Sequence, residues 1–260
     1  MTSTRKAAVV AGVFFLVTEV AAIAGLLLYG PALHGAQYVA GGGADRRVAL
    51  GAVCEVVLVV AVIGSAIALY PALRRRNEAL ALGYVCGRLL EAAVIAVGII
   101  AVLSVLTLRQ NEAGTPGAAA AAAALVAVHD RAFLLGPDIV LGLNSLLLAF
   151  LLHRSKLVPR GITVLGLVGG PLICASAVAV LFGAYPQVST PGSLAALPVF
   201  AWELALAFRL LTKGLAEHPS GGAAEGTADG AADGAANGRA DRLAGAAGVA
   251  GPVRQPVART

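Results

Sequence analysis

Six apolar stretches of about membrane-spanning length lie between residues 7 and 211 of this 260-residue chain. A helix that crosses the hydrocarbon core needs about 20 predominantly apolar residues at about 1.5 Å of rise each. Only 13% of the residues are charged, against about a quarter in an ordinary soluble domain. The stretches predict an all-α, polytopic membrane protein with six transmembrane helices. Their predicted bounds are 7–28, 48–73, 79–108, 132–152, 161–182 and 194–211.

The pattern within the stretches favours helices over the strands of a membrane barrel, because barrel strands alternate in polarity over about ten residues. The fifth stretch contains Gly166, Gly169, Gly170 and Pro171, which predicts close packing against a neighbouring helix and a kink. Pro198 is expected in the first turn of the sixth helix, where its missing N–H costs little.

The chain is expected to divide into a six-helix domain, residues 1–216, and a tail, residues 217–260, rich in glycine and alanine. Such a tail cannot offset its ordering entropy by burying large apolar side chains. We expect it to be disordered, cytoplasmic and dispensable, with a role as a tether or interaction arm as the alternative. Before the fourth stretch, the alanine run 118–124 has strong helix propensity but anchors weakly in lipid, which predicts a surface helix.

The basic residues predict the orientation of the domain. If the N-terminus is cytoplasmic, the inner loops carry nine Lys and Arg residues and the outer loops carry four, which favours cytoplasmic termini at both ends. The inner residues are Arg5, Lys6, Arg74, Arg75, Arg76, Arg154, Lys156, Arg160 and Lys213, and the outer ones are Arg46, Arg47, Arg109 and Arg131. The net charge of +5 is thus clustered beside apolar stretches, so membrane lipids are the expected partners and nucleic acid is not.

The first stretch has an alternative interpretation as a cleaved signal peptide, since Arg5 and Lys6 precede an apolar run and the small-residue motif at 22–24. The run continues to Leu28, beyond the usual length of a signal peptide, so a retained helix is the simpler interpretation. Tyr29 and Tyr84 are expected at the two membrane interfaces.

Motifs of known chemistry are missing from the sequence. Cys54, Cys86 and Cys174 lie inside predicted spans without the spacing of a zinc or redox pair, and we expect reduced packing residues. The four histidines have no partner four residues away, so metal ligation is a minor alternative. We therefore expect no metal, no cofactor and no enzymatic activity, although paired carboxylates alone could perform acid–base chemistry.

Polar side chains inside the predicted spans are the candidate functional residues, because a charge near the bilayer centre costs about 2.5–3.5 kcal/mol and needs partners. The candidate cluster is Glu55, Arg88, Glu91, Asn144 and Glu203, with Glu19 and Asp138 as weaker candidates. Arg88 and Glu91 are spaced i, i+3 and are expected to pair.

Three of the carboxylates, Glu55, Asp138 and Glu203, are expected about four to seven residues deep from the outer side, which would place them around a polar cavity open to the outside. Five carboxylates face one deep cation, because Arg209 lies near enough to the inner surface to snorkel. Some carboxylates must therefore be protonated, hydrated or neutralised by a bound cation.

Two classes of function remain open. The favoured one is a non-enzymatic membrane subunit, homo-oligomerisation being one arrangement, whose buried polar residues serve helix packing. The alternative is an outward-facing binding or transport-like protein for a small cation, a proton or a lipid headgroup.

Several strings of the sequence resemble a bacterial membrane family known as domain of unknown function 4386 (DUF4386). They are AIALYPAL (66–73), NEALALGY (77–84), RLLE (88–91), GLN (142–144), LVPR (157–160) and WEL (202–204). The resemblance implies a six-span protein of the bacterial cytoplasmic membrane and supplies no substrate. Of the candidate residues, Glu19 and Asp138 match the family pattern least.

Overall fold

The computed structural model describes residues 3–41, 43–115 and 117–216, and the predicted disordered tail lies outside the described residues. All regular elements within these ranges are helical. They are α1 (Ser3–Leu33), α2 (Ala36–Ala40), α3 (Asp45–Leu73), α4 (Glu78–Glu112), α5 (Ala118–Phe133), the π-helix η1 (Leu134–Val140), α6 (Leu141–Arg154), α7 (Arg160–Leu181) and α8 (Thr190–Thr212). With α5, η1 and α6 forming one continuous helix, six helices are long and apolar enough to cross a membrane. The all-α class and the six spans are confirmed.

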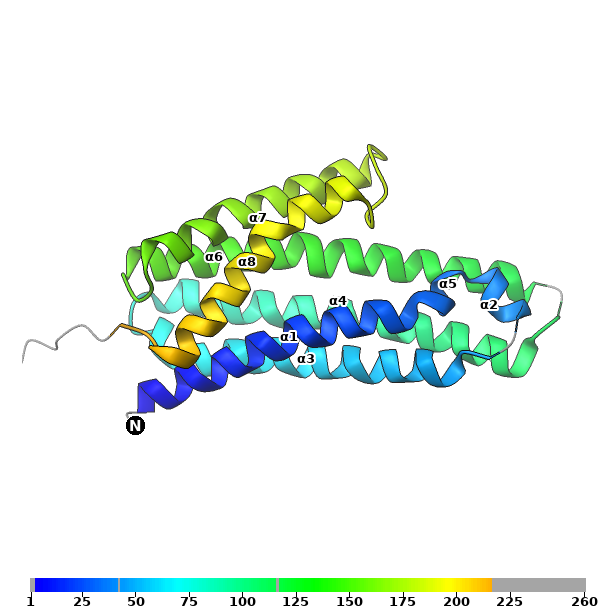
Figure 1. Cartoon of the computed structure of the whole chain (residues 1–260), viewed down its shortest axis with the longest axis horizontal. Helices are drawn as coiled ribbons and strands as arrows, with labels where there is room; N and C mark the ends of the chain where they lie inside the picture. Colours follow the sequence, from blue (N-terminus) through cyan, green and yellow to red (C-terminus); the bar gives the residue numbers. More distant parts are fainter. Residues whose placement is uncertain (1–2, 42, 116, 217–260) are drawn as a thin grey trace, which may run out of the picture. The chain divides into compact units, whose positions relative to one another are not determined.

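The six long helices contact one another in a closed order. Helix α1 packs against α3, α3 against α4, α4 against the α5–η1–α6 helix, α6 against α7, α7 against α8, and α8 against α1. Figure 1 shows α8 meeting α1 at the end that holds the start of the chain, while the pair of α7 and α8 lies apart from α1 at the other end. Polar side chains directed inward from this ring can therefore meet across several helices.

The start of α1 and the end of α8 lie together. The guanidinium of Arg5 donates hydrogen bonds to the backbone carbonyls of Leu210, Leu211 and Thr212 at 3.2, 2.9 and 2.7 Å. These carbonyls belong to the last turn of α8, whose acceptors have no partner within the helix. We call this the basic end of the domain and the opposite one, with α2 and the α7–α8 loop, the far end.

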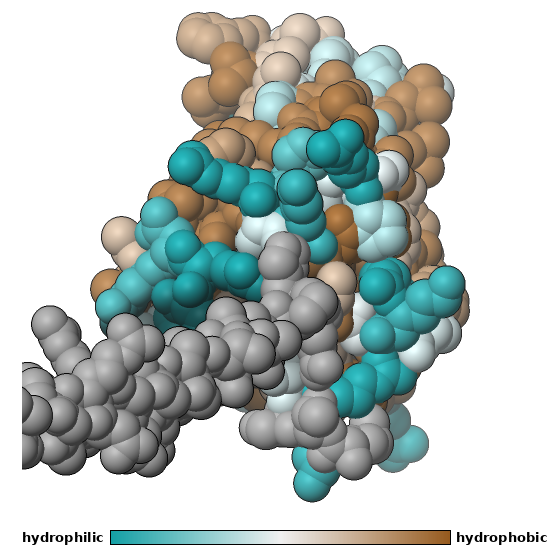
Figure 2. Space-filling view, turned by 90° about the vertical axis from the view of Figure 1, so that its left-hand side faces the viewer, coloured by the Kyte–Doolittle hydropathy of each residue, from teal (hydrophilic) through white to brown (hydrophobic). Residues whose placement is uncertain are grey.

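The sides of the bundle are apolar. Leu27 and Ile100 are each 64% exposed, although such residues are ordinarily buried in a soluble protein. Hydrophilic residues gather at the basic end, seen face-on in Figure 2. Because an apolar belt with polar ends matches the polarity profile of a bilayer, the protein is a multi-pass membrane protein.

Glycines let α6, α7 and α8 approach closely. Gly166, Gly169 and Gly170 are buried, as predicted for packing positions. A Cβ at Gly166 would lie 2.7 Å from Cδ2 of Trp202, and a Cβ at Gly170 would lie 2.5 Å from the carbonyl oxygen of Gly142. Small residues at these points bring the helix backbones together, which is the usual packing mode of helices in lipid.

The fourth span differs from its prediction. The alanine run does not form a separate surface helix but begins α5, which continues through η1 to the end of α6. Ala118 and Ala122 are buried because α5 packs against α4 and α2. Alanine suits this position because its small side chain permits close helix packing. The prediction of a surface helix rested on weak anchoring in lipid alone.

The position expected for Pro198, in the first turn of the last helix, is wrong. Helix α8 begins at Thr190, where the Ser189 hydroxyl accepts from the backbone N–H of Gly192 at 3.4 Å and Pro191 occupies the first turn. Pro198 therefore lies inside the helix. Helix α7 continues through Pro171 to Leu181, and the kink expected there stays a prediction.

The approach of α7 to α6 gives a direct test of the packing. Gly170→Ala places a methyl group against the carbonyl oxygen of Gly142, so we expect a fall in stability of about 1–3 kcal/mol, in the range of overpacked cores. Gly161→Ala, at the start of the same helix, meets no atom within 4 Å and is the matched control, expected to be neutral. Thermal unfolding in detergent measures both, and equal melting temperatures for the two variants would contradict the close packing of α6 on α7.

Candidate functional site

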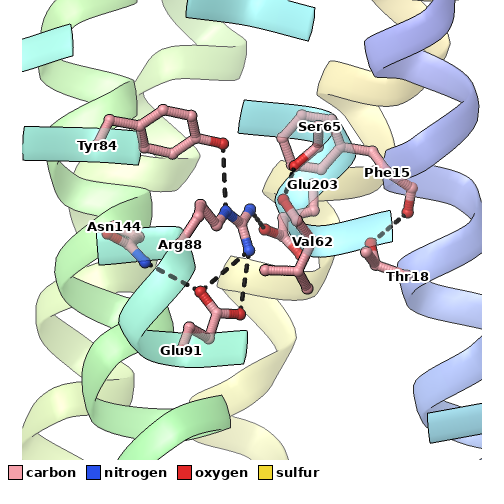
Figure 3. Close-up of polar contacts among 9 residues, drawn as sticks. All are labelled: Phe15, Thr18, Val62, Ser65, Tyr84, Arg88, Glu91, Asn144 and Glu203. Atoms are coloured by element: carbon pink, nitrogen blue, oxygen red, sulfur yellow. Dashed lines mark hydrogen bonds and ion pairs between the residues drawn. The ribbon is translucent and has the colours of Figure 1, made fainter. Parts of the chain in front are cut away.

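Arg88 on α4 is the centre of a buried polar network (Figure 3). Its Nη1 donates to Oε1 and Oε2 of Glu91 at 3.1 and 3.2 Å, and its Nη2 donates to Oε1 of Glu203 on α8 at 2.7 Å. Its Nε donates to the hydroxyl of Tyr84 at 3.2 Å. All three guanidinium nitrogens are thus bound, which satisfies the requirement that a buried charge be paired and hydrogen-bonded.

Further contacts extend the network to α6 and α1. The Asn144 side chain on α6 donates from Nδ2 to Oε2 of Glu91 at 2.9 Å. The guanidinium carbon of Arg88 lies 5.4 Å from the ring centre of Phe15 on α1 and 5.7 Å from that of Tyr84, within the range of cation–π attraction. Four of the six long helices therefore contact one guanidinium or its direct partner.

Gly87 makes the position of Asn144 possible. A Cβ at Gly87 would overlap the carboxamide of Asn144. The residue before Arg88 must therefore lack a side chain for Asn144 to reach Glu91.

The charges of the network do not balance. The side chains of Arg88, Glu91 and Glu203 are only 2%, 4% and 7% exposed, and two carboxylates share one guanidinium. A buried charge needs compensation, and one negative charge of the network lacks a counter-ion among its members.

A cavity of about 210 Å³ lies beside the network, inside the ring of helices. Every ionisable candidate residue lines it, the two weaker candidates included: Glu19, Glu55, Arg88, Glu91, Asp138 and Glu203. Most of the remaining wall is apolar, with Leu58, Val62, Ile95 and Phe200 among its residues. The cavity therefore combines an apolar wall with five acidic groups and a single basic one.

The candidate residues are brought together in two groups. Arg88, Glu91, Asn144 and Glu203 form the network, and the predicted pairing of Arg88 with Glu91 is confirmed at 3.1 Å. Glu19, Glu55 and Asp138 are half-buried on the cavity wall.

Glu203 lies farther along its helix than the apolar stretch suggested, and its depth in the membrane stays a prediction. Counted from the observed start of α8 at Thr190, Glu203 lies about 20 Å along the helix at about 1.5 Å per residue, because the helix begins before the apolar stretch. It pairs with Arg88 in the network, while Glu55 and Asp138 belong to the wall.

A second cavity of about 210 Å³ adjoins the first towards the α7–α8 loop. Phe133, Asp138, Ile173 and Ala196 line both cavities. Asp138, in the π-helix η1, accepts a hydrogen bond from Nε2 of Gln187 in the α7–α8 loop at 2.7 Å. Asp138 thus stands where the two cavities meet, on an irregular helical segment of a kind often found at functional sites.

A smaller cavity of about 20 Å³ lies on the other side of Glu55, between Glu55, Tyr29 and His129. This volume is sufficient for about one water molecule. Tyr29 is 1% exposed, and its hydroxyl has no hydrogen-bond partner among the described residues. The ring of Tyr29 packs edge-on against His129 inside the bundle, and its predicted depth at the membrane interface stays a prediction.

Several contributors were missed by sequence reasoning. Tyr84 was expected at the interface but is fully buried beside Arg88, and its i, i+4 spacing was the available signal. Gln187 lies in a loop and Phe15 in an apolar run, so neither carried a signal in the sequence.

The far end is fixed by a separate cluster. Arg109 pairs with Asp45 and lies over the ring of Tyr38 at 5.0 Å, and the Tyr38 hydroxyl donates to Asp45 at 2.9 Å. Burial and the hydrogen bond to Asp45 raise the pKa of Tyr38 above its ordinary value. These contacts join α2, α3 and α4, and none of the three residues lines the cavity beside Arg88.

Within residues 3–41, 43–115 and 117–216, no three His, Cys, Asp or Glu side chains gather as a metal site would require. The thiols of Cys54, Cys86 and Cys174 are free.

Arg88 gives the test of the network. Arg88→Leu leaves Glu91 and Glu203 without their counter-ion, and we expect a loss of about 3–5 kcal/mol of stability, as when one partner of a buried ion pair is removed. Folded yield and melting temperature in detergent measure the loss. Adding Glu91→Gln and Glu203→Gln to Arg88→Leu removes the stranded charges and should recover much of it, whereas no recovery would contradict the charge-pairing explanation.

Comparison with known proteins gave one match. A family model described as "Domain of unknown function (DUF4386)" matches residues 10–214, which include the whole network and the cavity wall. Neither the curated proteins nor the solved structures include a match to the chain.

Proposed function

The chain belongs to the DUF4386 family, and from its intramembrane cavity we propose that it is a non-enzymatic membrane protein that binds a small organic cation of the amine class. Its partners are membrane lipids and this cation. The proposal gives the residues of the buried cluster two separate tasks, packing and binding.

The charge imbalance of the cavity carries the proposal. Arg88, the only arginine among the described residues of its wall, is bound by Glu91 and Glu203. Glu19, Glu55 and Asp138 form no ion pair within the described part of the chain. An ionised carboxylate in an apolar cavity needs a counter-charge, and a bound ammonium group supplies one.

The shape and walls of the cavity favour an amine with an apolar body over a bare metal ion. A cavity of about 150 Å³ can hold a benzene molecule, so about 210 Å³ accommodates a small organic ion. Hydrophobic walls with a few convergent polar groups are typical of sites for small molecules. Leu58, Val62 and Phe200 would contact the apolar body, and Glu19 or Glu55 the ammonium group.

The network has the packing task that the sequence favoured. Arg88, Glu91, Asn144 and Glu203 satisfy one another and hold α4, α6 and α8 at fixed distances. The second cavity gives the ligand a route from the α7–α8 loop, past Asp138 and its hydrogen bond to Gln187. Binding and release from the far end would follow, as in a transport-like protein.

A proton is the second candidate ligand. A carboxylate without a counter-ion can also be neutralised by protonation, and Glu19 lines the cavity. Exchange of such a proton for an ammonium ion would keep the charge of the cavity constant.

Thermal unfolding with a charged ligand and its neutral isostere tests the proposal. We expect cyclohexylammonium to raise the melting temperature of the detergent-solubilised protein in a saturable manner. Cyclohexanol should have little effect, because only the cation can form an ion pair with the cavity carboxylates. Glu19→Gln should weaken the response at least tenfold without destabilising the protein, since it removes a cavity charge and leaves the pairs of Arg88 intact.

Glu112→Gln is the matched control, because Glu112 is exposed at the end of α4 and does not line the cavity. An equal response to amine and alcohol would contradict a cation site. Absence of any response across a panel of amines, with a stabilisation of the parent on acidification that Glu19→Gln removes, would favour the proton.

The orientation completes the proposal. We place the basic end in the cytoplasm of a bacterial cell, since the positive charges of the loops concentrate there. Both termini are then cytoplasmic, because α1 begins and α8 ends at this end, and the cavity route opens to the outside.

Reporter fusions test this orientation. A reporter that is active only outside the cytoplasm should be silent when fused after Thr260 and active when inserted at Ala44, which lies between α2 and α3 at the far end. Activity of the fusion at Thr260 would contradict the assignment, and so would a silent reporter at Ala44.

A further inference from the structure

A cavity at the basic end is independent of the proposed cation site. It has a volume of about 320 Å³ and lies where the turn between α3 and α4 meets the end of α6. Arg76 and Asn77 line it from the turn, and Arg154 lines it from α6. Leu80 and Phe150 supply an apolar wall.

The two guanidinium groups on this cavity have no partner within the described part of the chain. Neither the Arg76 nor the Arg154 side chain forms an ion pair or a hydrogen bond with another described residue. The guanidiniums of Arg88 and Arg109 both have carboxylate partners. Glu78, in the first turn of α4, is exposed and pairs with neither arginine. Two unpaired arginines on one cavity favour an anion with several acceptor oxygens.

The start of α4 adds to this preference. Asn77 caps the helix by accepting from the backbone N–H of Leu80 at 3.0 Å, and the other N–H groups of the first turn stay free of such a cap. The positive end of the helix dipole points to the side on which Arg76 stands.

The apolar side of the cavity continues onto the surface that faces lipid. Phe150 is 42% exposed and Leu143, seven residues earlier on the same face of α6, is 55% exposed. An acyl chain that leaves the cavity can therefore lie against apolar side chains of α6.

We propose that this cavity binds the headgroup phosphate of an anionic phospholipid of the phosphatidylglycerol type, with Arg76 and Arg154 on the phosphate and the acyl chains along Phe150 and Leu143. The charge of the headgroup distinguishes the lipid class, because a zwitterionic lipid carries an ammonium group that two arginines repel. The acyl chains distinguish a lipid from free phosphate, which cannot use the apolar wall.

Lipid titration of the purified full-length protein tests the proposal. The melting temperature of delipidated protein in neutral detergent is measured with added dioleoyl-phosphatidylglycerol, dioleoyl-phosphatidylcholine or inorganic phosphate. We expect a saturable rise with phosphatidylglycerol and little change with the other two. The double variant Arg76→Gln/Arg154→Gln should need at least tenfold more phosphatidylglycerol for half of the rise.

The control variant is Arg75→Gln/Arg160→Gln, which removes the same charge from the same end outside the cavity. It should respond as the parent does, and an equal loss in both double variants would overturn the site in favour of diffuse attraction. A rise of the same size with inorganic phosphate would overturn the lipid assignment. Because a double variant can fold poorly, native mass spectrometry of the parent provides a second measurement, in which failure to retain one phosphatidylglycerol in preference to phosphatidylcholine would overturn the proposal.

Discussion

A guanidinium group held inside the bundle is the constraint on which the rest of the structure depends. Arg88 is 2% exposed and cannot lose its charge at any ordinary pH, so the fold must supply acceptors for it. One acceptor comes from its own helix and another from α8, and Asn144 on α6 holds the first in place. The relative positions of α4, α6 and α8 are thus set by hydrogen-bond geometry, which is more directional than apolar contact between lipid-facing helices.

Close approach of the helix backbones makes these bonds reachable. Gly87 leaves room for Asn144, Gly170 lets α7 approach α6, and Gly166 accepts the ring of Trp202 one residue before Glu203. In a bilayer, an apolar helix surface contacts lipid tails about as favourably as it contacts another helix. Small residues and polar contacts therefore determine how the helices pack. Helix α8 contacts α1 at the basic end, whereas the α7–α8 pair lies apart from α1 towards the α7–α8 loop (Figure 1), on whose side the second cavity lies.

The sequence predicted those features that depend on local pattern. Apolar length alone located six spans, and the i, i+3 spacing identified the pair of Arg88 and Glu91. The partnership with Glu203 could only be suggested, because it joins residues 115 positions apart. Pro198 was misplaced because α8 begins at Thr190, before the apolar stretch. The role of Tyr84 was missed because a tyrosine at a membrane interface and one buried inside the bundle have the same local sequence. The alanine run was misjudged because its burial depends on α2 and α4, which no local pattern reveals.

The separation of the two carboxylate partners of Arg88 along the chain also bears on how the protein is made. Glu203 follows Arg88 by 115 positions, so the growing chain contains Arg88 and Glu91 before it contains Glu203. During that interval Glu203 is absent, and Glu91, one turn away on the same helix, is the carboxylate that can accompany the arginine into the bilayer. The carboxylate three residues away therefore provides a counter-ion for Arg88 during biogenesis. Helix α8 adds the second carboxylate, Glu203, only when translation of the domain is finished.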